Sequence, residues 1–146
     1  MLATDILKSK GGDVATIGLE HSVADIAILF ASKKIGFVVV ADDTGNCLGT
    51  VSERDVCQAI AKHAEAAVSM TAESVMTTNI VACSPPDSLA QIMSVMTVGR
   101  TRHVVVMDDG RMAGIISIGD VVKYRLEESL LDEKELRDYV LGSGYN

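Results

Sequence analysis

Aromatic residues, prolines and clusters of positive charge are scarce in this sequence. Its 146 residues include no Trp, two Phe, three Tyr and two Pro, although 48% of all residues are hydrophobic. The core must therefore be built from Val, Ile, Leu, Ala and the seven Met, and such a composition excludes a disordered chain. The net charge is -7 and no cluster of Lys and Arg occurs, which argues against a nucleic-acid partner or an anionic membrane surface.

Cysteine and long apolar runs are also scarce. Cys47, Cys57 and Cys83 are odd in number and lack C-x-x-C spacing, so we expect reduced thiols that are buried as small hydrophobic side chains. No apolar run approaches the roughly 20 residues that cross a bilayer, and residues 1–8 lack the features of a signal peptide. The sequence predicts a soluble cytoplasmic protein with no membrane partner.

The sequence contains two copies of one pattern. Residues 49–55 read Gly-x-hydrophobic-Ser-x-x-Asp, and residues 114–120 read the same, 65 positions later. The Val triplets at 38–40 and 104–106 correspond in a similar way. A unit of about 65 residues is marginally stable alone. We therefore expect the two copies to fold against each other around a pseudo-two-fold axis.

The hydrophobic pattern predicts an α+β fold with the order βαββα in each copy. The expected elements are strand 14–17, a helix capped by Ser22, strands 37–41 and 47–51 and helix 52–63, then strand 80–83, helix 88–98, strands 102–107 and 112–116 and a long helix from 117. The expected domains are an N-terminal segment with the first copy at 1–66, a linker with a turn of helix at 67–78, the second copy at 79–123 and a helical tail at 124–146.

The tail carries an apolar stripe on an otherwise charged helix. Its members are Leu126, Leu130, Leu131, Leu136 and Val140. The first copy has no equivalent segment. Packing of the stripe against another subunit is the favoured explanation, and packing against the parent domain is the alternative.

The repeated signature has two chemical interpretations. A Gly-ended strand followed by Ser at a helix start presents backbone N–H groups and a hydroxyl, which attract phosphate. A carboxylate three residues later, Asp55 or Asp120, can accept hydrogen bonds from a ribose diol. Ser-x-x-Asp also matches the capping box, in which both side chains satisfy backbone donors of their own helix. The spacing alone leaves both interpretations open.

Four features together resemble the cystathionine-β-synthase-type (CBS) domain family. They are the βαββα order, the Gly-x-hydrophobic-Ser-x-x-Asp ending, the apolar strand after residues 99–103, and the phrase Val75-Met76-Thr77 ahead of the second copy. The resemblance covers roughly residues 14–122 and implies a tandem CBS pair, or Bateman module, similar to stand-alone bacterial proteins. Such pairs bind adenosine-containing ligands, commonly AMP, ADP or ATP and sometimes NAD or NADH, and they usually form homodimers.

The resemblance also implies two clefts, each built from both copies. The principal cleft would join Ser52, Arg54, Asp55, Thr78, Asn79, Ile80, Arg102 and His103. The second cleft would join Ser117, Asp120, Gly12, Asp13, Val14, Gly36 and Phe37. Guanidinium groups form charge-assisted bonds with phosphate oxygens, and the second copy has Gly119 where the first has Arg54. We therefore expect weaker binding of phosphate-rich ligands in the second cleft, unless Lys10 or Lys34 reaches it.

The sequence leaves three functions open. The first is a sensor, in which nucleotide binding changes the conformation and the affinity for a protein effector that acts in trans. The second is a structural homodimer with vestigial clefts. The third, a nucleotide hydrolase, is disfavoured because the sequence contains no phosphate-loop, dinucleotide-fingerprint or H-E-x-x-H motif. The sequence predicts no catalytic residue, no metal site and no obligatory cofactor.

Overall fold

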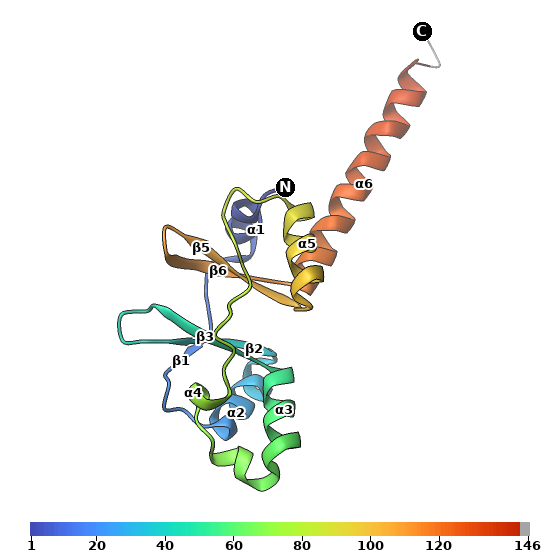
Figure 1. Ribbon diagram of the computed structural model, residues 1–146. Coiled ribbons are helices and arrows are strands. Elements are labelled where there is room, and N and C mark those ends of the chain that lie inside the picture. Colours follow the sequence, from blue (N-terminus) through green and yellow to red (C-terminus); the bar gives the residue numbers. More distant parts are fainter. Residues whose placement is uncertain (144–146) are drawn as a thin grey trace.

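Two three-stranded sheets lie face to face at the centre of the molecule, with helices on their outer sides (Figure 1). The computed structural model describes residues 1–143. In each sheet the middle strand runs parallel to the first strand and antiparallel to the third. The strands are β1 (Thr16–Ile17), β2 (Phe37–Ala41) and β3 (Cys47–Ser52) in one sheet and β4 (Ala82–Cys83), β5 (His103–Asp108) and β6 (Arg111–Ser117) in the other. The predicted α+β fold with two βαββα copies is confirmed.

The middle strands are apolar on both faces because each of them faces two hydrophobic cores. Val38 and Val40 of β2 lie in the core of the first repeat. Phe37 and Val39, on the other face of β2, pack with Val105 of β5 in a core between the two sheets. The second repeat alternates in the same way. A strand buried on both faces needs a continuous apolar run, which is what the sequence shows.

The helices cover the outer faces of the sheets. Within residues 1–143 they are α1 (Ala3–Lys10), α2 (Val23–Lys33), α3 (Glu53–His63), the 3₁₀ helix η1 (Ala64–Ser69), α4 (Ala72–Val75), α5 (Leu89–Gly99) and α6 (Ile118–Ser143). Ser22, Ser52 and Ser88 cap α2, α3 and α5, because each hydroxyl accepts a hydrogen bond from the backbone N–H three residues ahead. The predicted cap at Ser22 is confirmed.

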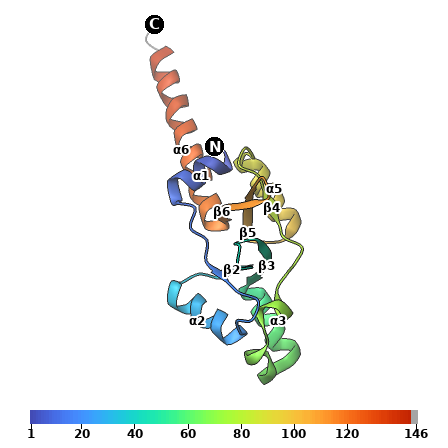
Figure 2. The ribbon, with the colours of Figure 1, turned by 90° about the vertical axis from the view of Figure 1, so that its left-hand side faces the viewer.

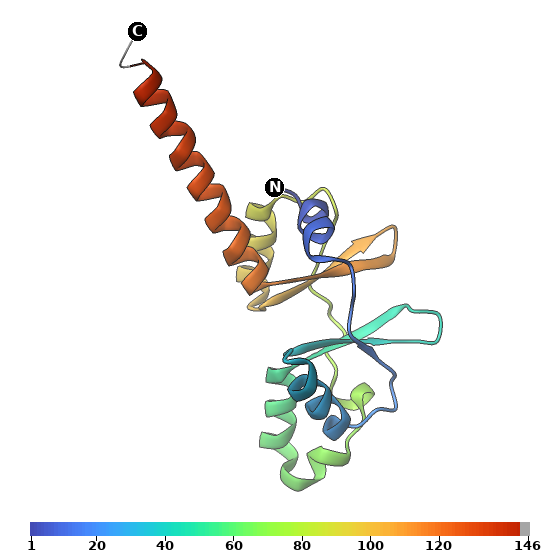
Figure 3. The same cartoon turned by 180° about the vertical axis from the view of Figure 1, so that it is seen from behind.

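The two short helices α1 and α4 exchange places between the repeats. α1 precedes the first repeat but packs in the core of the second, where Ala3 and Ile6 are fully buried. α4 precedes the second repeat but packs in the core of the first through Ala72. Figures 2 and 3 show α1 beside the second sheet, at the opposite end of the molecule from α2 and α3. Residues 67–78, expected as a linker with a turn of helix, contain the short helix α4 and also help to build the first repeat's core.

The glycine of the repeated signature makes room for this exchange. Gly49 of β3 lies against Met76, and Gly114 of β6 lies against Leu7. A Cβ atom at Gly49 would lie 2.9 Å from the Thr77 carbonyl oxygen, and one at Gly114 would lie 2.5 Å from the Leu7 side chain, so each glycine allows a closer approach than a residue with a Cβ. The glycine thus has a packing role in both copies, whereas the sequence suggested a role in phosphate binding.

The second half of α6 extends beyond the body of the molecule (Figure 1). Val121 and Tyr124, near its start, are buried in the second core. The expected apolar stripe is 55% to 62% exposed, and its residues are Leu126, Leu130, Leu131, Leu136 and Val140. The stripe therefore does not pack against the parent domain. The expected tail is helical through residue 143, and residues 144–146 lie outside the described part. No helix of residues 1–143 is both long enough and apolar enough to cross a membrane.

Candidate functional site

Asp55 stands in the first turn of α3 and has both carboxylate oxygens engaged. Its Oδ2 accepts hydrogen bonds from the Ser52 backbone N–H at 2.8 Å and from the Ser52 hydroxyl at 3.1 Å, and its Oδ1 accepts one from the Thr77 hydroxyl at 3.1 Å. The capping box is therefore formed. Two of the three donors are hydroxyls, which can turn their protons toward a ligand. The cap and a diol acceptor are thus compatible in one carboxylate.

Asp55 lies in the wall of a cavity of about 300 Å³ to which both repeats contribute. The lining residues are Phe37, Thr50, Ser52, Arg54, Asp55, Thr77, Asn79, Val81, Gly99, Arg100, Thr101 and His103. Apolar surface from Phe37 and Val81 occurs together with convergent polar groups from Asp55, Thr77 and Asn79. Such a mixed wall is typical of small-molecule sites.

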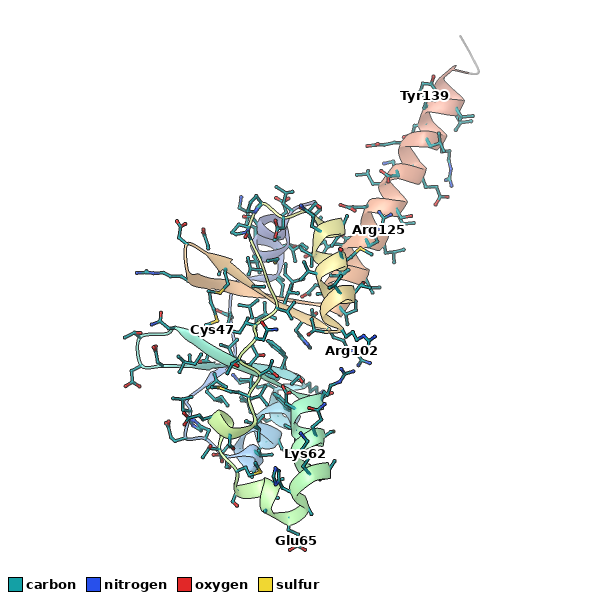
Figure 4. All side chains as sticks on the ribbon, viewed as in Figure 1. Cys47, Lys62, Glu65, Arg102, Arg125 and Tyr139 are labelled. Carbon is teal, nitrogen blue, oxygen red and sulfur yellow. The ribbon has the colours of Figure 1, made fainter. Side chains whose placement is uncertain are left out.

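A larger cavity of about 760 Å³ adjoins the first, with Arg54 and Arg100 among the residues that line both. Its wall also contains Lys34 and Arg102, so four cationic side chains meet there with one acid, Glu53. Figure 4 shows Arg102 at the opening between the two repeats. None of the four cations forms an ion pair or a side-chain hydrogen bond with the part of the chain that the structure describes. We call this space the cationic cavity, and its unpaired charge attracts anions.

Lys34 and Arg100 have backbone conformations that residues with a Cβ rarely adopt. They end α2 and α5 with φ values of 54° and 48°, in the left-handed region. Glycine is the usual residue at this position, because a Cβ there costs roughly 1–2 kcal/mol. The two repeats therefore share a strained position that carries a long cation, and both cations line the cationic cavity. Strain of this kind is concentrated at functional sites.

The repeats also meet at a stacked pair of rings. The ring centroids of Phe37 and His103 are 4.5 Å apart, and the ring planes differ by 10°. Burial lowers the pKa of His103, and the charge of Lys10 lowers it further, whereas Asp120 acts in the opposite direction. His103 is therefore neutral near pH 7. It supplies an aromatic surface, and no charge, to the two cavities that it lines.

The second copy of the signature has the same cap but a different neighbour. Asp120 Oδ2 accepts hydrogen bonds from the Ser117 backbone N–H at 2.9 Å and hydroxyl at 3.0 Å, and it forms an ion pair with Lys10 Nζ at 2.6 Å. Burial raises the pKa of Asp120, but the hydrogen bonds from Lys10 and Ser117 and the charge of Lys10 outweigh burial and hold the pKa below its ordinary value. Lys10 thus reaches Asp120, whereas Lys34 lines the cationic cavity.

The structure brings together most of the residues predicted for the principal cleft. Five of them line the Asp55 cavity, namely Ser52, Arg54, Asp55, Asn79 and His103. Arg102 lines the adjoining cationic cavity. Thr78 and Ile80 line neither cavity, because Thr77 takes the place beside Asp55 and Ile80 packs in the core between the sheets.

The residues predicted for the second cleft are divided. Ser117 and Asp120 form the cap described above, but Gly36 lines the cationic cavity and Phe37 lines the Asp55 cavity. Gly12 runs close to β6. Asp13 is exposed, and Val14 packs in the core between the sheets. Gly36 and Phe37, expected at the second cleft, thus line the cavities around Arg54 and Asp55.

Sequence reasoning missed two residues that the geometry makes prominent. Thr77 ends the Val75-Met76-Thr77 motif, which directly precedes the second copy. This motif could have marked Thr77 as a candidate site residue. Arg100 stands at the position equivalent to Lys34, directly after a helix and where Gly is usual. A cation in that place in both copies was the signal for Arg100.

The cysteines do not gather into a site. Burial raises the pKa of the half-buried Cys47 and raises that of the buried Cys83 to about 11. Figure 4 shows Cys47 away from Arg102, at the other end of the interface between the repeats. Cys57 is exposed, in contrast to the expectation. Among residues 1–143, no three His, Cys, Asp or Glu side chains are placed to hold a metal ion.

Comparison with known proteins decides the family. The family model described as "CBS domain" matches residues 3–62 and 72–127. The chain belongs to the CBS-domain family. Each matched segment contains one βαββα repeat and the short helix that precedes it, so the protein is a tandem CBS pair.

Two relatives of this CBS pair come from a bacterium and a plant. A CBS-domain containing protein from Agrobacterium tumefaciens, known from a crystal structure, has 44% sequence identity to this chain. The two structures superpose over 86% of this chain and 99% of the other, with a TM-score of 0.83. CBSX3, a mitochondrial CBS domain-containing protein from Arabidopsis thaliana, is 28% identical over 97% of this chain and 72% of its own length.

A third CBS pair was solved with ligands. The pair of protein MJ0100, in complex with 5'-methylthioadenosine and S-adenosyl-L-methionine, is 22% identical, with a TM-score of 0.77 over 88% of this chain and 98% of that chain. At this identity the likeness shows a common fold.

Proposed function

We propose that this CBS pair is a regulatory module that binds an adenine nucleotide between its repeats. The nucleoside occupies the Asp55 cavity, and the phosphates extend into the cationic cavity. The observation that carries the proposal is the junction of the two cavities. One of them holds an acid beside rotatable hydroxyls, and the other holds four unpaired cations.

At the nucleoside end, the ribose diol donates hydrogen bonds to Asp55. The Ser52 and Thr77 hydroxyls that now bond to this carboxylate can turn toward ligand oxygens, while the Ser52 backbone N–H keeps the cap. Asn79 offers an amide for hydrogen bonds, and Phe37 and Val81 offer apolar surface for the base. These groups recognise a nucleoside without any catalytic step.

At the phosphate end, charge favours a ligand with more than one phosphate. Four cations and Glu53 leave a surplus of positive charge in the wall of the cationic cavity. A phosphate monoester carries about -1.5 to -2 charges at pH 7, so AMP would leave part of this surplus unneutralised. We therefore expect ADP or ATP to bind more tightly than AMP. The adenosine-type ligands of the MJ0100 pair support the nucleoside part of the proposal.

Regulation follows from the position of the cavities. Both repeats line them, so a bound nucleotide favours one arrangement of the repeats over others by its difference in affinity. The exposed stripe on α6, which begins at Leu126, offers a surface through which a homodimer forms or a protein effector responds. We propose a homodimer, with an effector that acts in trans.

A structural dimer with vestigial clefts is the second candidate, and one observation favours it. Ser22 and the exposed Asp25 form the same capping box as Ser52 and Asp55, and Asp25 lines neither of the two cavities. The Ser-x-x-Asp part of the signature therefore also serves as a plain cap in this chain. Asp25 is for this reason the matched control for Asp55.

The test is a thermal unfolding experiment with and without ATP. At a ligand concentration 100 times Kd, binding adds about 2.7 kcal/mol to stability, which corresponds to a rise of roughly 5–10 °C in Tm. We expect this rise for the wild type and for Asp25→Asn, and no rise for Asp55→Asn. If ATP leaves the Tm of the wild type unchanged, or if Asp55→Asn shows the same rise as Asp25→Asn, the proposed function is wrong.

A further inference from the structure

Lys10 holds two acceptors of the second repeat at once. Its ammonium donates a hydrogen bond to the Ile115 carbonyl oxygen at 2.8 Å and pairs with Asp120 Oδ2 at 2.6 Å. The side chains of Lys10 and Asp120 are only 30% and 19% exposed, so the pair is partly withdrawn from water. A charge pair in this setting is screened less than one on the open surface.

Thr77 holds the equivalent acceptors of the first repeat without any charge. Its backbone N–H donates to the Thr50 carbonyl oxygen at 2.8 Å, and its hydroxyl donates to Asp55 at 3.1 Å. Thr50 and Asp55 correspond to Ile115 and Asp120 in the repeat. The Lys10 ammonium therefore takes the place of the Thr77 N–H and hydroxyl. A ligand must displace a cation at Asp120 but only a neutral hydroxyl at Asp55.

The chain around Lys10 is built to keep the ammonium in this place. Lys10 ends α1, whose residues Ala3 and Ile6 are fully buried in the second core. Gly11 follows with a φ of 93°, and a Cβ on Gly12 would lie 2.9 Å from a carbonyl oxygen of β6. The segment thus leaves the helix through a turn that favours glycine and runs tightly along β6.

A ligand diol faces different obstacles at the two carboxylates. Asp120 Oδ2 already accepts from the Ser117 N–H, the Ser117 hydroxyl and Lys10. An ammonium has donors only, so it cannot turn to accept from a ligand as a hydroxyl does. Displacing it would separate a partly buried charge pair and leave Asp120 without its cation.

We propose that Lys10 is the built-in occupant of the Asp120 cleft and restricts each chain to one adenine nucleotide, bound at Asp55. Lys10 is in this sense a specificity-determining residue, since it makes the equivalent carboxylates Asp55 and Asp120 unequal in what a ligand must displace. The inference rests on the proposed function, because it assumes that the Asp55 cleft binds nucleotide.

The test counts bound nucleotides per chain by equilibrium dialysis of the full chain, with ATP and with AMP as probes. AMP is included because the second repeat has Gly119 in place of Arg54 and offers less charge to a triphosphate. The wild type should bind one nucleotide per chain. Lys10→Met, which keeps the length of the side chain, should bind two. Lys8→Met, on the exposed side of the same helix, is the matched control and should bind one.

Two further variants make the outcome decisive. Lys10→Gln should also bind two nucleotides, which keeps the test valid if Lys10→Met does not fold. In the double variant Lys10→Met with Asp55→Asn, the remaining nucleotide should be the one at Asp120. A wild type that binds two per chain, or folded Lys10 variants that bind one, would overturn the inference while leaving the Asp55 site intact. A wild type that binds none refutes the proposed function itself.

Discussion

Replacing Lys34 or Arg100 by glycine should stabilise the protein and weaken ATP binding at the same time. Both residues end a helix in the left-handed conformation. Removing the Cβ relieves roughly 1–2 kcal/mol of strain, and the greater freedom of glycine in the unfolded chain cancels about 0.4–1 kcal/mol of that gain. A net gain of about 1 kcal/mol corresponds to a rise of roughly 2–4 °C in the Tm of the ligand-free protein.

The same substitutions remove one cation each from the wall of the cationic cavity. A hydrogen bond to a charged group contributes about 1.5–3 kcal/mol, so each variant should bind ATP roughly tenfold to a hundredfold more weakly. The double variant should lose more affinity than either single variant. Calorimetric titration gives the affinity, and thermal unfolding without ligand gives the stability.

Asp109→Gly is the matched control for this pair of effects. Asp109 also has a left-handed backbone, with a φ of 49°, but it lies in the turn between β5 and β6 and lines neither cavity. It should gain stability and keep full affinity for ATP. If Lys34→Gly and Arg100→Gly gain stability but bind ATP like the wild type, the two cations are merely solvated and the reasoning is refuted.

Two other predictions concern pH and assembly. The pKa of His103 is lower in the folded protein than its ordinary value of 6.5. Below about pH 6.5 the unfolded chain therefore binds more protons than the folded protein, and stability should fall as the pH drops through this region. His103→Phe should remove most of this loss in thermal unfolding measured across the pH range, and an unchanged pH profile would argue against the assignment. Leu126→Glu should convert a dimer to a monomer in sedimentation experiments with little change in Tm, because Leu126 is exposed within the chain. Glu135→Lys, on the helix face opposite the stripe, should remain dimeric. A wild type that sediments as a monomer contradicts the proposed use of the stripe.

Most of the fold could be predicted because each repeat carries its own local signals. The continuous apolar run of β2 predicted a strand at residues 37–41, and the structure has the same bounds. Ser22, Ser52 and Ser88 marked helix starts to within a residue, since a hydroxyl before an apolar periodic segment is a strong cap signal. Repetition helped as well, because each assignment could be checked against the other copy.

The exchange of α1 and α4 could not be predicted in the same way. Which repeat a short helix covers depends on packing between distant segments, and local propensity does not contain this information. A faint signal exists, since Ala3, Ile6 and Leu7 have the same spacing as Ala72, Val75 and Met76. It becomes meaningful once the glycine that faces Leu7 or Met76 is known.

The site residues that belong to the repeated signature could be predicted from the sequence. Those that reach the site through the contact between the two repeats could not. Asp55 and Arg54 follow from the signature itself. Gly36 and Phe37 were expected in the second cleft only, but the stacking of Phe37 on His103 brings that segment to the cavities around Asp55 and Arg54. Such contacts across the pseudo-two-fold axis arise from the packing of two sheets, which no local pattern describes.

A crystal structure of the protein grown with ATP would show whether the two adjoining cavities bind the nucleotide. We expect adenosine in the cavity beside Asp55, with both ribose hydroxyls on the carboxylate and the phosphates among Lys34, Arg54, Arg100 and Arg102. Electron density for ATP elsewhere on the chain, or both cavities filled by solvent alone at saturating ATP, would contradict it.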